Sequence, residues 1–154
     1  MIETRRIAII TGGSRGMGRD TAMRLAQQGV SSIITYNSRQ GEAEQVVLAI
    51  EEAGASAVAL QLNVGEASTF DSFVTKVRAA LVELGADSFD YLVNNAGTSS
   101  AATLESGTEQ ELDAQFAVHF KGPFLLTQKL LPLMNDGGRI VNISSGLARF
   151  SFPG

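Results

Sequence analysis

The sequence predicts one α/β domain built around a doubly wound parallel sheet. Two observations carry this prediction: five short apolar runs recur along the 154 residues, and a longer amphipathic stretch separates each run from the next. Parallel neighbours need a long crossover connection, and a helix is the usual one. The length suits a single domain with its own hydrophobic core.

The apolar pattern places the individual elements in order. All four residues of Ile7–Ile10 are apolar, as in a parallel strand that is covered on both faces. Gly29 and Gly54 stand where the first two helices should end. Thr108 and Glu111 have the spacing of a capping box that opens a long helix. The expected strands are 7–10, 32–36, 55–62, 89–93 and 139–143, and the expected helices are 16–28, 40–53, 69–84 and 108–134.

Composition and charge exclude several classes of function. A formal net charge of −4 provides no basic surface for a nucleic acid or an anionic membrane. Without cysteine the chain has no disulfide framework and no thiolate ligands, and we expect no metal site. The first apolar run is too short for a signal peptide or a membrane span, so we expect a cytoplasmic protein.

The turn after the first strand, residues 11–18, has the sequence TGGSRGMG. Gly12 would permit a tight turn, Gly16 would let a diphosphate approach the backbone, and Gly18 would let the helix pack close to the sheet. The N–H groups at the start of the following helix would favour phosphate. Glycines can also simply punctuate a turn, but the strand–loop–helix context favours a nucleotide site.

Four segments resemble the short-chain dehydrogenase/reductase family. TGGSRGMG at 11–18 is similar to its cofactor loop, and NNAG at 94–97 is similar to its signature after the fourth strand. HFKGPF at 119–124 and GRIVNISS at 138–145 match two further segments, in the family's order. The resemblance implies a Rossmann-like NAD(P)-binding domain over residues 1–154. It also implies an oxidoreductase that interconverts a small-molecule carbonyl and a secondary alcohol.

The residues after the second strand favour NADP over NAD. An acid there would hold the 2′-hydroxyl of NAD, but the sequence has Asn37, Ser38 and Arg39, with no acid before Glu42. A guanidinium attracts a 2′-phosphate, so Arg39 and the loop residue Arg15 are candidates to bind it. Either arginine could instead be a solvated surface residue. The Ser-Arg pair in the loop resembles the NADP-preferring branch of the family.

The resemblance implies further cofactor contacts. Asn63 and Val64 end the third strand, where the family usually has Asp-Val reading the adenine amino group, and the amide oxygen of Asn63 can accept the same hydrogen bond. Asn95 would line the pocket or, alternatively, form a turn. The expected cofactor-binding residues are Gly12, Ser14, Arg15, Gly16, Met17, Gly18, Asn37, Ser38, Arg39, Asn63, Val64, Asn95, Ala96 and Gly97.

Two residues match catalytic positions of the family. Ser145 matches its serine, with Ser144 as the alternative, because side chains alternate along a strand and only one can face the site; either could instead cap the strand end. His119 stands where the family usually has asparagine. Pro123 has no N–H and cannot bond the His119 carbonyl, so we expect that carbonyl to keep the water of the family's proton relay. An inert, hydrogen-bonded histidine is the alternative.

The Tyr-x-x-x-Lys pair of the family is missing from this sequence. That spacing places both groups on one helix face, where the ammonium lowers the phenol pKa. The family would place the pair just beyond residue 154, so we expect a truncated chain that binds nucleotide better than it catalyses. The alternative is a non-catalytic NAD(P)-binding module or sensor. The tyrosines present are Tyr36 and Tyr91, and the lysines are Lys76, Lys121 and Lys129.

The long helix presents more apolar surface than one sheet face needs. The resemblance implies that it pairs with the helix of a second copy, giving a homodimer or homotetramer, whereas ordinary packing on the sheet is the alternative. The apolar residues concerned are Leu112, Phe116, Phe120, Phe124 and Leu131.

Overall fold

The computed structural model describes residues 6–150 and confirms the α/β class. Five parallel strands form one sheet in the order β3-β2-β1-β4-β5. The strands are β1 (Ile7–Ile10), β2 (Ser31–Tyr36), β3 (Ala57–Gln61), β4 (Phe89–Asn94) and β5 (Met134–Asn142). The α-helices are α1 (Gly16–Ala26), α2 (Gln40–Glu52), α3 (Phe70–Glu83), α4 (Glu109–Phe116) and α5 (Gly122–Leu130).

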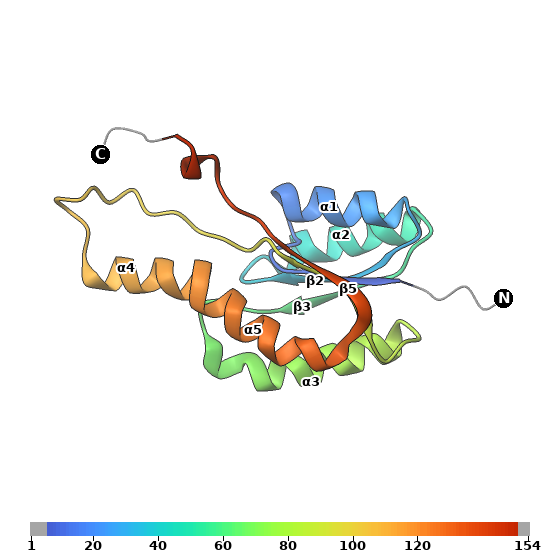
Figure 1. Ribbon diagram of the computed structural model, residues 1–154. Helices are drawn as coiled ribbons and strands as arrows, with labels where there is room; N and C mark the ends of the chain where they lie inside the picture. The colour runs from blue at the N-terminus through green and yellow to red at the C-terminus, as the bar shows by residue number, and fades with distance from the viewer. Residues whose placement is uncertain (1–5, 151–154) are drawn as a thin grey trace.

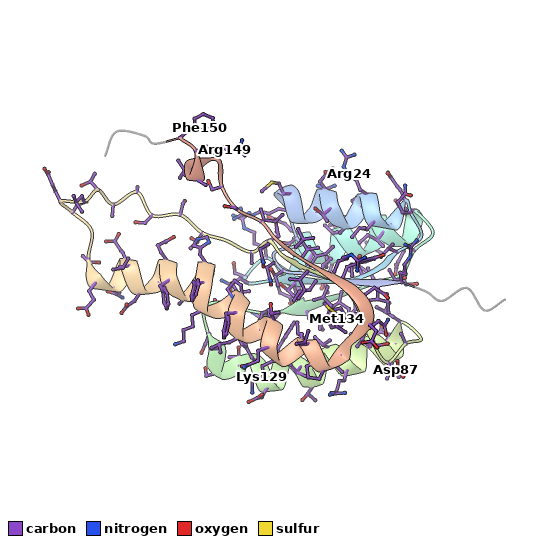
Figure 2. All side chains as sticks on the ribbon, viewed as in Figure 1. Arg24, Asp87, Lys129, Met134, Arg149 and Phe150 are labelled. Atoms are coloured by element: carbon purple, nitrogen blue, oxygen red, sulfur yellow. The ribbon has the colours of Figure 1, made fainter. Side chains whose placement is uncertain are left out.

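Helices cover both faces of the sheet, as Figure 1 shows. The face under α1 and α2 is packed with small and β-branched side chains, among them Ala22 and Val46. The face under α3 and α5 holds the larger ones, such as Phe73 and Leu126. Lys129 of α5 lies beside α3 (Figure 2), and its ammonium is 2.6 Å from the carboxylate of Asp71. These two sets of buried side chains, one on each face of the sheet, form the hydrophobic core that holds the strands in position.

The order of the strands reverses at β1. The chain runs outward from β1 through β2 to β3, and then crosses over to place β4 on the other side of β1. The connections that follow β1 and β4 therefore leave the carboxyl-terminal end of the sheet in opposite directions. In an open α/β sheet, a crevice forms at this point, outside the carboxyl ends of the strands.

The prediction of one helix over 108–134 is wrong in its middle and at its end. The capping box is confirmed, since Thr108 Oγ1 accepts the Glu111 N–H while the Glu111 carboxylate accepts the Thr108 N–H. A π-helical segment (Ala117–Lys121) then separates α4 from α5, and the Gly122 N–H bonds the carbonyl five residues back. A Cβ on Gly122 would lie 2.0 Å from the Val64 carbonyl oxygen. The chain therefore passes close to the end of β3 at Gly122, directly after the π-helical segment.

Strand β5 begins earlier than 139, the start that the sequence predicts. Met134, which we expected to end the helix, follows a 3₁₀ turn (Leu131–Leu133) and pairs with Phe89. Regular pairing with β4 starts only at Arg139, beyond an irregular segment in which Gly137 has φ +79°. Among residues 6–150, β5 pairs with β4 alone and forms a sheet edge. No helix of the described part is long and apolar enough to cross a membrane.

Candidate functional site

A cavity of about 420 Å³ opens where the strand order reverses. It collects residues from the loop after β1, the end of β2, the end of β3 and the segment after β4. Twelve expected cofactor residues line it: Gly12, Ser14, Arg15, Gly16, Asn37, Ser38, Arg39, Asn63, Val64, Asn95, Ala96 and Gly97. Five further residues, which the sequence does not predict as part of the site, also line the cavity: Thr35, Tyr36, Leu62, Thr98 and Val118.

The three glycines of the loop have different environments. Gly12 and Gly16 have φ of +66° and +55°, a region that L side chains rarely adopt. A Cβ on Gly16 would meet nothing within 4 Å, so the backbone there is open to an incoming group. A Cβ on Gly18 would lie 2.3 Å from the Gly12 carbonyl oxygen. Gly18 therefore packs behind the loop and does not line the cavity.

Thr11 joins the glycine loop to the NNAG segment. Its hydroxyl oxygen accepts the N–H groups of Asn95 and Ala96, each at 3.0 Å. The Asn95 amide donates in turn to the carbonyls of Thr11 (2.8 Å) and Gly12 (3.1 Å). Asn95 thus holds the loop backbone in place. The one sequence signal for Thr11 was a hydroxyl residue directly after a buried strand.

A second threonine holds the same loop from the other side. The Gly12 N–H donates to the Thr35 hydroxyl at 3.1 Å, and the Gly13 N–H donates to the Thr35 carbonyl at 2.8 Å. Loop residues 11–13 are therefore bonded to both neighbouring strand ends. This leaves little freedom for the backbone that faces the cavity.

The first asparagine of NNAG belongs to the sheet and not to the cavity. The Asn94 amide donates to the side-chain oxygens of Asn142 (2.8 Å) and Thr127 (3.2 Å). These bonds tie β4 to β5 and to α5. The Ile143 N–H also donates to the Asn94 carbonyl, so the segments after β4 and β5 start side by side (Figure 1).

The charged residues that line the cavity are both cationic. They are Arg15, at the entrance to α1, and Arg39, at the entrance to α2. No aspartate or glutamate is among the lining residues. A guanidinium pair without a lining carboxylate attracts an anion, since each guanidinium matches the geometry of a phosphate.

Just after β3, the side-chain amide of Asn63 already takes part in one hydrogen bond. The Asn63 side-chain oxygen accepts the Gly65 N–H at 3.0 Å. A carbonyl oxygen has two lone pairs, so one acceptor position remains for a ligand amino group. Val64 and Val118 add apolar lining beside it.

His119 and Ser145 are not among the lining residues. His119 Nε2 is 2.7 Å from the Thr98 carbonyl oxygen, and a Cβ on Gly97 would lie 3.0 Å from His119 Cε1. The imidazole therefore packs behind the cavity wall formed by Gly97 and Thr98. Ser145 Oγ accepts the Leu147 N–H at 3.2 Å and caps the short 3₁₀ turn Gly146–Ala148. Met17, another expected site residue, is exposed on α1 and does not line the cavity either.

A parallel sheet with a glycine loop at the point where its strand order reverses defines the Rossmann-like class of α/β folds. Within that class, residues 6–154 match the family model described as short chain dehydrogenase, and the chain belongs to this family.

Curated relatives and solved structures agree with this assignment. The chain is 34% identical over 148 residues to the short chain dehydrogenase/reductase AacuN of Aspergillus aculeatus, covering 96% of this chain and 54% of the relative. It is 36% identical over 149 residues to the 3-oxoacyl-[acyl-carrier-protein] reductase FabG of Staphylococcus aureus, covering 96% and 58%. The chain therefore spans little more than half the length of these relatives.

Two solved ketoreductases have the same fold over nearly the whole chain. The promiscuous reductase LugOII, described as catalysing keto-reduction during lugdunomycin biosynthesis, is 39% identical, with a TM-score of 0.90 and coverage of 96% of this chain and 62% of LugOII. The landomycin C-6 ketoreductase LanV, solved with bound NADP and rabelomycin, is 36% identical, with a TM-score of 0.91 and coverage of 96% and 61%.

Proposed function

We propose that this chain binds NADP and forms the nucleotide-binding part of an oxidoreductase that interconverts a carbonyl and a secondary alcohol. The observation that carries the proposal is the cavity where the strand order reverses, with its open glycine backbone and two arginines and without a lining carboxylate. The NADP present in the solved LanV structure supports the same cofactor.

The cavity residues fit the parts of a dinucleotide. The backbone at Gly16 and the first turn of α1 would hold the diphosphate, because N–H groups at a helix start favour anions and nothing lies within 4 Å of the Cβ position at Gly16. Arg15 and Arg39 would bind the 2′-phosphate, and Asn63 would accept the adenine amino group. When bound, the nicotinamide supplies or accepts the hydride.

Ser145 and His119 would act at the substrate end. Because Ser145 Oγ accepts the Leu147 N–H, its own hydroxyl proton stays available for donation to a substrate oxygen. His119 would act as a positioning residue, since an Nε2–H donated to the Thr98 carbonyl fixes the cavity wall. We further propose that the His119 carbonyl holds a water that relays protons.

The second candidate is a nucleotide-binding module without catalysis. Tyr36 lies on β2 and Tyr91 on β4, where Tyr91 accepts a hydrogen bond from Arg6. Neither phenol therefore stands one helical turn from a lysine. Residues 6–150 supply binding and orientation but no tyrosine–lysine proton donor of the family's type.

Nucleotide titration of the protein expressed from its gene tests both candidates. We expect NADPH to bind more tightly than NADH in isothermal titration calorimetry, and NADPH to be oxidised when a carbonyl compound is added. Binding without oxidation of NADPH across a panel of ketones would favour the module. If neither nucleotide binds, both candidates are refuted.

We also propose that the exposed face formed by α4, the π-helical segment and α5 pairs with a second copy of the chain. Large apolar side chains line up along it, and the rings of Phe116 and Phe120 stack with centroids 5.2 Å apart. An apolar surface of this kind is typical of a homo-oligomer interface. Sedimentation equilibrium of the wild type and of Phe120→Glu tests this, and a monomeric wild type would refute it.

A further inference from the structure

Arg15 and Arg39 both line the cavity, but they differ in what holds them. The guanidinium of Arg39 is 2.6 Å from the carboxylate of Glu42, three residues further along α2. Within residues 6–150, the Arg15 side chain has no hydrogen bond or ion pair. The Arg15 guanidinium can therefore bind an incoming anion directly, whereas the Arg39 guanidinium is already paired with the Glu42 carboxylate.

Glu42 is well placed to be that internal anion. It lies in the first turn of α2, where the positive end of the helix dipole favours a carboxylate. It does not line the cavity, so it touches the ligand site only through Arg39. The Glu42 carboxylate nevertheless contacts the same guanidinium that we propose as a ligand of the 2′-phosphate.

We propose that Glu42 is a specificity-determining residue that competes with the 2′-phosphate for Arg39 and so limits the preference for NADP over NAD. This inference rests on the proposed function. A phosphate that reaches Arg39 must share or displace the carboxylate, and the two anions repel each other. Both partners of the ion pair are about half exposed, with 54% of the Arg39 side chain and 41% of the Glu42 side chain accessible. Exposed pairs are weak, so the exchange is feasible and its effect is a few-fold.

The test compares the binding of two probes that differ only in the 2′-phosphate, adenosine 2′,5′-bisphosphate and adenosine 5′-monophosphate. Glu42→Gln removes the charge but keeps the size of the side chain. We expect it to tighten binding of the bisphosphate by about two- to five-fold and to leave the monophosphate unchanged.

Glu44→Gln is the matched control, because it removes the same charge from the same helix. Glu44 is exposed and accepts a hydrogen bond from Gln40, with no arginine involved. We expect the affinity ratio of the two probes to stay at the wild-type value in this variant. In an Arg39→Gln background, Glu42→Gln should no longer change the ratio, since the competition requires the guanidinium.

The outcomes separate this inference from the proposed function. If Glu42→Gln weakens the bisphosphate or leaves the ratio unchanged, Glu42 is not a competitor, although the nucleotide site stands. A gain of the same size in Glu44→Gln would indicate a general charge effect and overturn the inference. If the wild-type protein binds neither probe, nor NADPH nor NADH, the proposed function fails together with it. The decisive measurement is the calorimetric affinity ratio of the two probes in wild type, Glu42→Gln and Glu44→Gln.

Discussion

Replacing Thr11 by valine removes one hydroxyl from the point where the ends of β1 and β4 meet. Thr11 is 2% exposed. Its hydroxyl oxygen accepts the N–H groups of Asn95 and Ala96, both at 3.0 Å, and its O–H donates to the Val93 carbonyl oxygen at 3.4 Å. Valine keeps the β-branched shape, so the packing of the site changes little. The substitution therefore isolates the hydrogen bonds that hold the loop.

The expected loss follows from these contacts. Two partly buried N–H donors lose their acceptor, and each unsatisfied donor of this kind costs about 1–2 kcal/mol. The long bond to Val93 adds little. We therefore expect Thr11→Val to lower the free energy of unfolding by about 2–4 kcal/mol.

Urea unfolding followed by far-ultraviolet circular dichroism measures this loss. Thr11→Ser keeps the hydroxyl and should retain most of the stability. Thr75→Val is the matched control, since Thr75 is exposed on α3 and bonds only the Asp71 carbonyl of its own helix; we expect a change within about 0.5 kcal/mol. The reasoning is refuted if Thr11→Val is as stable as Thr75→Val, or if Thr11→Ser is as unstable as Thr11→Val.

Three further predictions concern the loop, the start of α4 and the cavity wall. Gly18→Ala places a Cβ 2.3 Å from the Gly12 carbonyl oxygen, so we expect a loss of about 1–3 kcal/mol in urea unfolding and weaker NADPH binding; unchanged affinity would contradict the close packing. Hydrogen bonds from Thr108 lower the pKa of Glu111 from its ordinary value of 4.5. The carboxylate therefore stabilises the α4 start fully above that value, and the contribution disappears as pH falls through the lowered pKa. Hydrogen exchange of the Thr108 amide, followed by NMR, should show this loss of protection. Equal protection of that amide above and below the lowered pKa of Glu111 would disprove the prediction. We expect His119→Asn to leave turnover by the protein expressed from its gene largely intact, because the backbone carbonyl of the relay is unchanged and the asparagine amide keeps an N–H donor at this position. A collapse in kcat would refute the backbone-carbonyl relay.

Local patterns in the sequence determined much of the fold and part of the site. Burial on both faces makes a parallel strand apolar throughout, which is why Ile7–Ile10 could be placed from its residues alone. The capping box at Thr108 and Glu111 has a fixed spacing, because it joins groups within one helical turn. The glycine loop and NNAG fall at strand ends, and the order of elements places both at one edge of the sheet.

Other features depend on contacts between residues far apart in the chain. The bonds from Thr11 to the NNAG segment join positions 84 and 85 residues apart, and no local spacing announces them. The π-helical segment arises where Gly122 crosses the Val64 backbone, although the apolar period of the helix continues unbroken through it. The sequence also does not show which way a side chain points: Arg39 contacts Glu42, and His119 contacts the Thr98 carbonyl. The amino-acid pattern was sufficient to place most of the strands and helices, since helix and strand periods are local, but it did not show the interruption between α4 and α5 or the early start of β5. Which polar groups meet depends on the folded chain, because the order of the strands in the sheet brings those groups together.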